Sequence, residues 1–263
     1  MYVGVDIGGR EGDNTKLAIL HNGDSRPTVA AIHDVPPKGD DFIVNFLVEK
    51  KDSLDVVGID SPFELPPCIR CGKTPCPGAT NCTSSEARMI MDSEGNPYAE
   101  RLTEMHVTRA LKEVRPMQTM ALGQILARTM YLLKRLRSEE FPVERVKEVY
   151  PKASLFAFKR ALELSAEFDH AVRRYKTKYE GLAARAFIVD ALSPLMNFSS
   201  FGEECVENHD KLDSTISGLS AYYSAKGLTI PKPQSMPEDA GWIEIPDWTR
   251  ILAPFKAVEF RKG

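Results

Sequence analysis

Residues 55–60, Asp-Val-Val-Gly-Ile-Asp, are the stretch that most restricts how this chain can fold. The run has the length of a strand and is almost wholly apolar, so it lacks the alternation of a strand with one face in water. Strands of this kind occur inside sheets that are covered on both faces. We therefore expect a layered α/β fold, with the carboxylate of Asp60 at the end of an interior strand.

The order of the other elements agrees with a layered α/β fold. Short apolar runs predict strands, and apolar residues at helical spacing predict helices. The predicted strands are 2–7, 16–21, 28–35, 55–60, 146–150 and 241–246, and the predicted helices are 42–51, 117–136, 152–164, 166–175, 179–196 and 203–226. We expect one domain over residues 1–263, with a mixed central sheet flanked by helices. A cysteine-rich loop and helical segments, residues 61–138, form an insertion after the fourth strand.

Acidic residues stand at or near the ends of three predicted strands, at Asp6, Asp60 and Glu148. Strand ends converge at one edge of an open α/β sheet. The last long predicted helix adds Asp210 and Asp213, which are three residues apart and so lie on one side of it. Five carboxylates brought together repel one another unless hard cations such as Mg²⁺ or Mn²⁺ neutralise them. We therefore predict that these five residues are catalytic in a metal-dependent hydrolase of phosphodiesters.

Two other functions fit parts of the sequence. The N-terminal strand-turn-strand, with Gly8 and Gly9 after Asp6, resembles the first phosphate-binding hairpin of sugar kinases and actin-like ATPases. That class places a hydroxyl residue soon after the glycines, where this chain has Arg10, and it needs a later glycine pair, which this sequence lacks. The second alternative is a binding module that keeps the fold without catalysis. Each acid alone is also explained as a cap or a surface charge, so the hydrolase prediction depends on their joint placement.

Several motifs of this chain match those of a known family. They are VGVD at 3–6, GIDSPF at 58–63, EVYP at 148–151 and HDKLDSTISGLSAYY at 209–223, with weaker matches at Lys178, Gly181, Arg185 and GWIEIP at 241–246. Over most of its length, the chain resembles the predicted RNase H-like nuclease family catalogued as domain of unknown function 429. The resemblance implies an RNase H-like fold in which Asp6, Asp60 and Asp213 bind Mg²⁺ or Mn²⁺, with Asp210 and Glu148 close by. It also implies that the substrate is nucleic acid or another phosphodiester.

Four basic residues are candidates for binding a substrate phosphate, namely Lys16, Arg109, Lys178 and Arg185. Lys16 begins the second predicted strand, Arg109 lies in a helix of the insertion, and Lys178 and Arg185 belong to the weaker family matches. Each is also explained as a solvated charge or as the partner of a nearby acid. The basic runs 134–137 and 173–178 are interpreted as solvated helix faces. The charged turn at 10–14 has no predicted role.

Four of the five cysteines lie close together, in a C-x2-C-x4-C-x5-C pattern formed by Cys68, Cys71, Cys76 and Cys82. Four thiolates can hold Zn²⁺ tetrahedrally, and a loop with almost no apolar residues needs such a metal to supply its folding energy. We predict structural zinc, with an iron–sulfur cluster, disulfides or unligated thiols as alternatives. The loop directly follows Asp60, so we expect it to overhang the carboxylates.

Charge and hydropathy restrict the class of protein. The net charge is −3, so there is no overall basic footprint of the kind that marks many nucleic-acid-binding domains. No apolar run approaches the roughly 20 residues of a membrane span. The N-terminus begins with a predicted strand and has no signal-type segment. We expect a cytoplasmic protein with no membrane partner, and the sequence predicts no oligomeric state.

Overall fold

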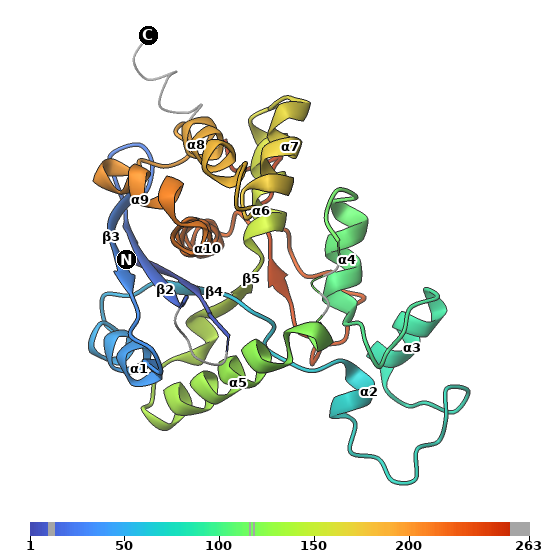
Figure 1. Ribbon diagram of the computed structural model, residues 1–263. Helices are drawn as coiled ribbons and strands as arrows, with labels where there is room; N and C mark the ends of the chain where they lie inside the picture. Colours follow the sequence, from blue (N-terminus) through green and yellow to red (C-terminus); the bar gives the residue numbers. More distant parts are fainter. Residues whose placement is uncertain (10–13, 116, 118, 253–263) are drawn as a thin grey trace.

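The computed structural model describes residues 1–9, 14–115, 117 and 119–252, and its centre is a six-stranded mixed sheet (Figure 1). The strands are β1 Tyr2–Asp6, β2 Lys16–His21, β3 Thr28–Asp34, β4 Val56–Asp60, β5 Val146–Val149 and β6 Ile243–Glu244. They lie in the order β3-β2-β1-β4-β5-β6. β2 runs antiparallel to β1 and β3, whereas β1, β4, β5 and β6 are parallel. The mixed α/β fold expected from the sequence is confirmed.

Helices flank both faces of the sheet. The longer ones are α1 Asp40–Glu49, α3 Ser85–Asp92, α4 Leu102–Ala110, α5 Gly123–Ser138, α6 Pro151–Ala161, α7 Ala166–Arg174, α8 Gly181–Ala191 and α10 His209–Ala225. The shorter ones are α2 Pro67–Arg70, α9 Gly202–Glu207 and the 3₁₀ turns Thr119–Leu122, Val143–Arg145 and Ser199–Phe201. Helices α1 and α5 lie on one face of the sheet, and α6 to α10 lie on the other (Figure 1).

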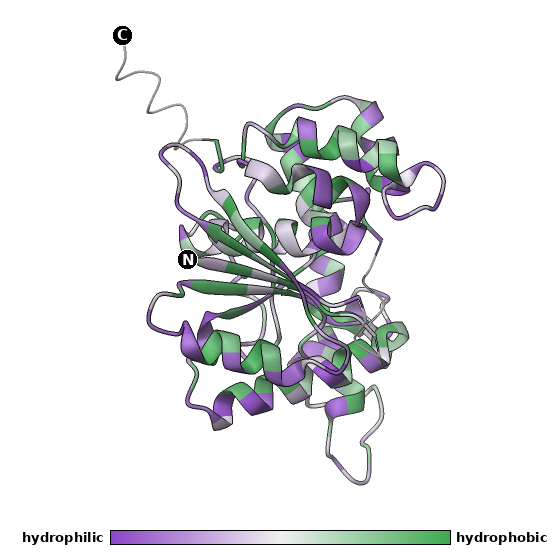
Figure 2. Ribbon diagram, turned by 60° about the vertical axis from the view of Figure 1, so that its left-hand side comes forward, coloured by the Kyte–Doolittle hydropathy of each residue, from purple (hydrophilic) through white to green (hydrophobic). Residues whose placement is uncertain are grey.

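Each face of the sheet has its own hydrophobic core, because alternate residues of a strand point to opposite faces. Val5 and Ile59 belong to the core that β1 and β4 share with α1 and α5. Tyr2 and Val56 belong to the core that these strands share with α6 and α10. Figure 2 shows the largely hydrophobic strands between the two helical layers. The burial of residues 56–59 on both faces explains why this run shows no polar alternation.

Helix α10 packs directly against the backbones of β1 and β4. A Cβ atom built on Gly4 would lie 2.0 Å from the carbonyl oxygen of Ser214 and 2.1 Å from the backbone nitrogen of Gly218. A Cβ atom on Gly58 would lie 2.5 Å from the carbonyl oxygen of Ser217. These glycines and small residues therefore let the helix lie closer to the sheet than any larger side chain allows. This close packing determines how near the first turns of α10 lie to the ends of β1 and β4.

The substitution Gly4→Ala is expected to lower the free energy of unfolding by about 3 kcal/mol, because the added methyl group overlaps the backbone of α10 and forces it away. Urea unfolding followed by circular dichroism measures this loss. The matched control is Gly9→Ala, since a Cβ atom on Gly9 meets nothing within 4 Å. Equal stability of the two variants would contradict the close approach of α10.

The helix predicted over residues 203–226 is two helices. Asn208 adopts an extended conformation between α9 and α10, with φ −128° and ψ 119°. Its side-chain oxygen accepts hydrogen bonds from the backbone nitrogens of Asp210 at 2.7 Å and Lys211 at 3.2 Å. This N-cap stabilises a new helix start inside a continuous apolar pattern. Asp210 and Asp213 consequently lie in the first turns of α10 rather than in the middle of a longer helix.

The segment between β4 and β5 also differs from its prediction. The helix expected over 117–136 becomes regular only at Gly123, after the 3₁₀ turn, and position 118 of that prediction lies outside the described residues. The α2–α3 loop projects away from the body of the molecule in both ribbon views and does not overhang the strand ends (Figures 1 and 2). The predicted turn at 10–13 lies outside the described residues. Among the described helices, none has the length and apolar character needed to cross a membrane.

Candidate functional site

Two aspartates stand side by side at the ends of β1 and β4. These strands are parallel neighbours, and their register pairs Asp6 with Asp60. Paired residues of parallel strands point to the same face of a sheet, and each aspartate follows a residue, Val5 or Ile59, that is buried on the α5 face. Both carboxylates therefore point to the opposite face, toward α10. The strand-end placement predicted from the sequence brings these two acids together.

Helix α10 contributes a third, fully buried carboxylate, that of Asp213. Its Oδ1 accepts a hydrogen bond from the hydroxyl of Tyr175 at 2.8 Å. Its Oδ2 lies 2.5 Å from Nζ of Lys176. Asp210, one turn earlier, is mostly buried, and its carboxylate lies 3.2 Å from Nε2 of His209. The segment just after α7 thus holds Asp213 in place through both of its oxygens.

The pKa shifts of these acids indicate that they share one site. Burial raises the pKa of Asp6 well above its usual value, and repulsion from Asp213 and Asp60 raises it further. Burial likewise raises the pKa of Asp60 to about 7, and Asp213 adds to this rise while Lys176 opposes it. Burial also raises the pKa of Asp210, with a further contribution from Asp213. We refer to Asp6, Asp60, Asp210 and Asp213 as the carboxylate cluster.

Lys176 places its ammonium group in contact with this cluster. The Lys176 side chain is half exposed, and its partial desolvation lowers its pKa, but attraction to Asp213, Asp60 and Asp6 outweighs this effect, and the net shift is upward. The run 173–178, which the sequence predicts to be a solvated helix face, therefore places one ammonium group against three acids. Of the six residues 173–178, Tyr175 is buried and the other five are exposed, so most of the run does face solvent.

Metal-free protein is expected to lose stability as the pH rises from about 4 to about 7. The unfolded chain releases the Asp60 proton near the ordinary aspartate pKa of 3.8, whereas the folded chain holds it until the pH reaches about 7. The folded state therefore binds more protons in this window, and the free energy of unfolding falls as the pH rises. Urea unfolding in a chelator at about pH 5 and about pH 7.5 measures the difference. The contribution of Asp60, on the order of 2 kcal/mol, should vanish in Asp60→Asn; a pH dependence unchanged in that variant would contradict the assignment.

The donor atoms of the cluster suit a hard divalent cation, because they are carboxylate oxygens that repel one another and already face the charge of an ammonium group. However, no three acidic, histidine or cysteine side chains of residues 1–9, 14–115, 117 and 119–252 stand at the spacing of a metal site. In this arrangement Lys176 balances part of the negative charge. The cation that the cluster faces in this structure is this ammonium group, 2.5 Å from Oδ2 of Asp213.

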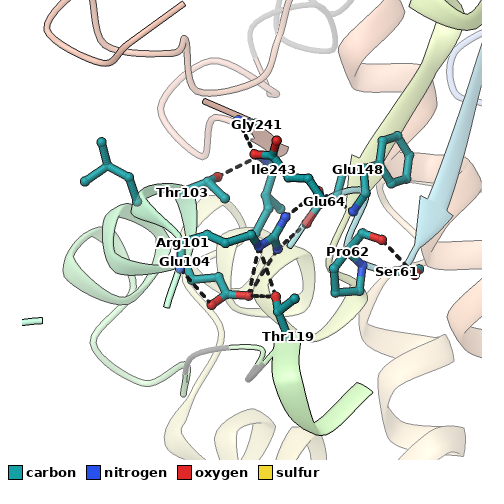
Figure 3. A network of polar contacts seen from close by, with 12 residues as sticks. Ser61, Pro62, Glu64, Arg101, Thr103, Glu104, Thr119, Glu148, Gly241 and Ile243 are labelled. Atoms are coloured by element: carbon teal, nitrogen blue, oxygen red, sulfur yellow. Dashed lines mark hydrogen bonds and ion pairs between the residues drawn. The ribbon is translucent and has the colours of Figure 1, made fainter. Parts of the chain in front are cut away.

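Glu148, the fifth predicted acid, forms a bidentate ion pair with Arg101 (Figure 3). The guanidinium nitrogens lie 2.9 Å and 2.6 Å from the two carboxylate oxygens, and Arg101 is wholly inaccessible to solvent. Arg101 also donates to Glu104 and Thr119, and the backbone nitrogen of Phe63 donates to Glu148 at 3.1 Å. Glu148 lies close enough to raise the pKa of Asp60. Both of its oxygens are engaged, so its part in catalysis stays a prediction.

A basic cavity of about 210 Å³ opens beside the carboxylate cluster. It is lined by Asp60, Tyr150, Lys152, Val172, Arg173, Tyr175 and Lys176. Burial lowers the pKa of Lys152, and repulsion from the neighbouring cations Lys176, Arg173 and Arg115 lowers it further. A cavity with three basic side chains and one acid has the charge to receive an anion next to the carboxylate cluster. Lys152 is not among the residues predicted from the sequence, although it directly follows the EVYP motif.

Of the four predicted phosphate-binding residues, Arg185 and Lys16 lie near the cluster. Arg185 donates hydrogen bonds to the backbone carbonyls of Tyr175, Val206 and Glu207. Gly181 gives it room, since a Cβ atom there would lie 2.7 Å from an Arg185 nitrogen. Gly181 and Arg185 therefore act together to hold the backbone at Tyr175 in place.

Lys16 pairs with Asp6 in the β1–β2 register and forms an ion pair with Asp34 at 3.0 Å. Its charge also lowers the pKa of Asp210, partly offsetting burial. The two remaining candidates lie elsewhere. Arg109 is exposed on α4. Burial lowers the pKa of the nearby His106, and the charge of Arg109 lowers it further. Lys178 is exposed, and its ammonium group lies over the ring of Tyr179.

A family model described as "Protein of unknown function (DUF429)" matches residues 4–240. No curated protein and no solved structure matches the chain.

Proposed function

The chain belongs to the DUF429 family of proteins of unknown function, and from its strand-end carboxylates we propose that it is a divalent-metal-dependent phosphodiesterase, more specifically a nuclease. One observation carries the proposal. Asp6, Asp60 and Asp213, which come from two strands and a helix, share one site with the ammonium group of Lys176. An arrangement that concentrates acids and then holds a cation among them is typical of sites for hard metal ions.

We further propose that the fold is RNase H-like, as the sequence motifs suggest. The support is a mixed sheet in which an antiparallel hairpin continues into parallel strands, with the acids on β1, β4 and α10. The motifs VGVD, GIDSPF and HDKLD lie at these three places, and nearly all of their residues fall within the stretch that the family model matches.

In this proposal Asp6, Asp60 and Asp213 hold Mg²⁺ or Mn²⁺, with Asp210 adjoining. A divalent cation bound there supplies the positive charge that favours ionised water as a nucleophile and stabilises a leaving oxygen. The chain's own groups hold Asp213 in place. The hydroxyl of Tyr175 donates a hydrogen bond to Asp213, and the guanidinium of Arg185 donates one to the backbone carbonyl of Tyr175. Lys176 offsets part of the negative charge of the acids in the metal-free chain, and its ammonium group would have to move away from Asp213 for these acids to hold a metal ion.

The basic cavity provides the substrate contact in this proposal. Lys152 and Arg173 line it beside Asp60, so a phosphate bound to them lies next to the carboxylate cluster. Phosphate oxygens bind to such cations through charge-assisted hydrogen bonds, which are the strongest kind available. The substrate class that fits is a nucleic-acid backbone, because it presents successive phosphates rather than a single charge.

The direct test is a cleavage assay on single-stranded and double-stranded DNA and RNA, hybrid and junction substrates, and on a small phosphodiester. We expect cleavage in the presence of Mg²⁺ or Mn²⁺ and none in a chelator. A metal-supplied, folded protein that cleaves none of these substrates would contradict the proposal and favour a binding module without catalysis.

Removing the basic side chains of the cavity should weaken substrate binding more than turnover. Lys152→Met and Arg173→Met are each expected to raise KM about tenfold, because each removes a charge-assisted contact to phosphate. The matched control is Lys134→Met, an exposed lysine on α5, on the opposite face of the sheet. A change in KM no larger than that of the control would place the substrate elsewhere.

A further inference from the structure

A second cavity, of about 410 Å³, lies beside α2 and α3. Its wall includes all four cysteines of the C-x2-C-x4-C-x5-C pattern, namely Cys68, Cys71, Cys76 and Cys82. All four are free thiols. The fold therefore brings four sulfur atoms, spread over fifteen residues of sequence, to one hollow.

The loop that carries these cysteines has no core of its own. Residues 71–81 are exposed and contain no helix or strand. Within the described chain, no residue from 68 to 84 belongs to a hydrophobic core cluster. A loop of this length and composition cannot offset its conformational entropy through burial, so its structure requires another source of stability.

The two ends of the loop are firmly attached. Arg70, between the first two cysteines, forms ion pairs with Glu64, at 2.8 Å, and with the buried Glu86 of α3. Glu64 in turn accepts a hydrogen bond from the backbone nitrogen of Gly241 at 2.6 Å. At the other end, the side chain of Ser84 caps α3. The chain between these anchors carries Cys71, Cys76 and Cys82; a hydrogen bond from Lys73 to Thr83 spans it, but no ion pair is found between these anchors among the described residues.

We propose that this cavity is a structural Zn²⁺ site whose ligands are the thiolates of Cys68, Cys71, Cys76 and Cys82. Four thiolates complete a tetrahedral shell and leave no position for substrate, which is the pattern of a structural zinc site. Binding releases the four thiol protons to solvent and changes no oxidation state. The resulting site has a net charge of about −2, and Lys73 lines the same cavity with a compensating charge.

The four thiols do not yet stand at ligand spacing in the described residues. Zinc binding therefore has to draw the exposed segment inward onto Cys68, which is held by α2. This movement is possible because the ends of the loop are attached and its middle is not. The expected consequence is that zinc converts residues 71–84 from a segment sensitive to proteases into a resistant one.

The test is metal analysis of the full chain purified from a zinc-supplemented culture, together with limited proteolysis. We expect about one zinc ion per chain, and a thiolate-to-metal charge-transfer band when Co²⁺ replaces it. Cys71→Ser and Cys76→Ser remove exposed thiols, so they should lose the zinc and expose the loop to protease without unfolding the domain. The control Cys205→Ala removes the buried fifth cysteine, which lies outside the cavity, and should retain the zinc.

Three results would overturn the zinc site: absence of bound zinc with four thiols open to alkylation, iron with acid-labile sulfide in its place, or a mass that shows disulfides between these cysteines. The variant Asp60→Asn should keep its zinc, because the cysteine cavity and the carboxylate cluster share no residue. The zinc site can therefore fail while the nuclease proposal stands, and the reverse also holds.

Discussion

Asp60→Asn is expected to lower metal-dependent kcat/KM about 10³-fold, the largest change in activity that we predict for any single substitution. The substitution removes one of three carboxylates that would bind the metal, and it leaves an amide of nearly the same shape. Because Asp60 is paired in register with Asp6, the remaining acids cannot take its place without moving a strand of the sheet. Steady-state cleavage at several metal concentrations measures the effect and shows whether excess metal restores any activity.

The stability of this variant separates a catalytic role from damage to the fold. Burial and repulsion raise the pKa of Asp60 to about 7, so its ionised form destabilises metal-free protein above that pH. Asp60→Asn should therefore be inactive yet more stable than the unsubstituted chain at about pH 7.5 in a chelator. The control Asp190→Asn alters an exposed acid on α8 and should change neither property. An active Asp60→Asn protein would remove this residue from the mechanism.

Arg101→Met is expected to give the largest loss of stability, about 3–5 kcal/mol in the free energy of unfolding. The substitution leaves Glu148 and Glu104 buried, 2% and 1% exposed, without the guanidinium group that neutralises both of them. Equilibrium unfolding in urea measures the loss. The matched control is Arg109→Met, in the last turn of α4, the helix that Arg101 directly precedes; its side chain is exposed, and its replacement should cost less than about 0.5 kcal/mol.

A second variant distinguishes the loss of a charge from the loss of packing. In Arg101→Met with Glu148→Gln, one of the two unpaired carboxylates becomes neutral, so part of the stability should return. Failure of the double variant to recover any stability would mean that Arg101 acts mainly as a space-filling side chain. A single-variant loss below about 1 kcal/mol would contradict the role of the Arg101–Glu148 pair altogether.

The parts of the fold and site that follow from local pattern could be predicted from the sequence. The apolar run before Asp60 identifies an interior strand, and the end of β1 places Asp6 beside it, because both strands are parallel and in register. The small residues Ser217 and Ala221, on the aspartate side of α10, indicate that this side can pack closely on a sheet, and a Cβ atom built on Gly58 would lie 2.5 Å from the carbonyl oxygen of Ser217. In each case one strand or one helix face carries the information.

The parts that depend on partners distant in sequence could not be predicted. Arg101 lies 47 residues from Glu148, and no local pattern indicates that the two side chains meet. Lys176 belongs to a basic run that has the composition of a solvated helix face, and only the tertiary fold brings it to Asp213. The break at Asn208 was missed because an N-cap can interrupt an apolar pattern that continues on both sides.

The most direct test of the central proposal is a titration of the metal-free chain with Mn²⁺ at about pH 7.5, with free Mn²⁺ measured by electron paramagnetic resonance. If Asp6, Asp60 and Asp213 form a metal site, the chain binds Mn²⁺ in one or two equivalents, and Asp213→Asn loses this binding while remaining folded. If the unsubstituted chain leaves Mn²⁺ free, or if Asp213→Asn binds it equally well, the carboxylate cluster is not a metal site and the proposed function is wrong.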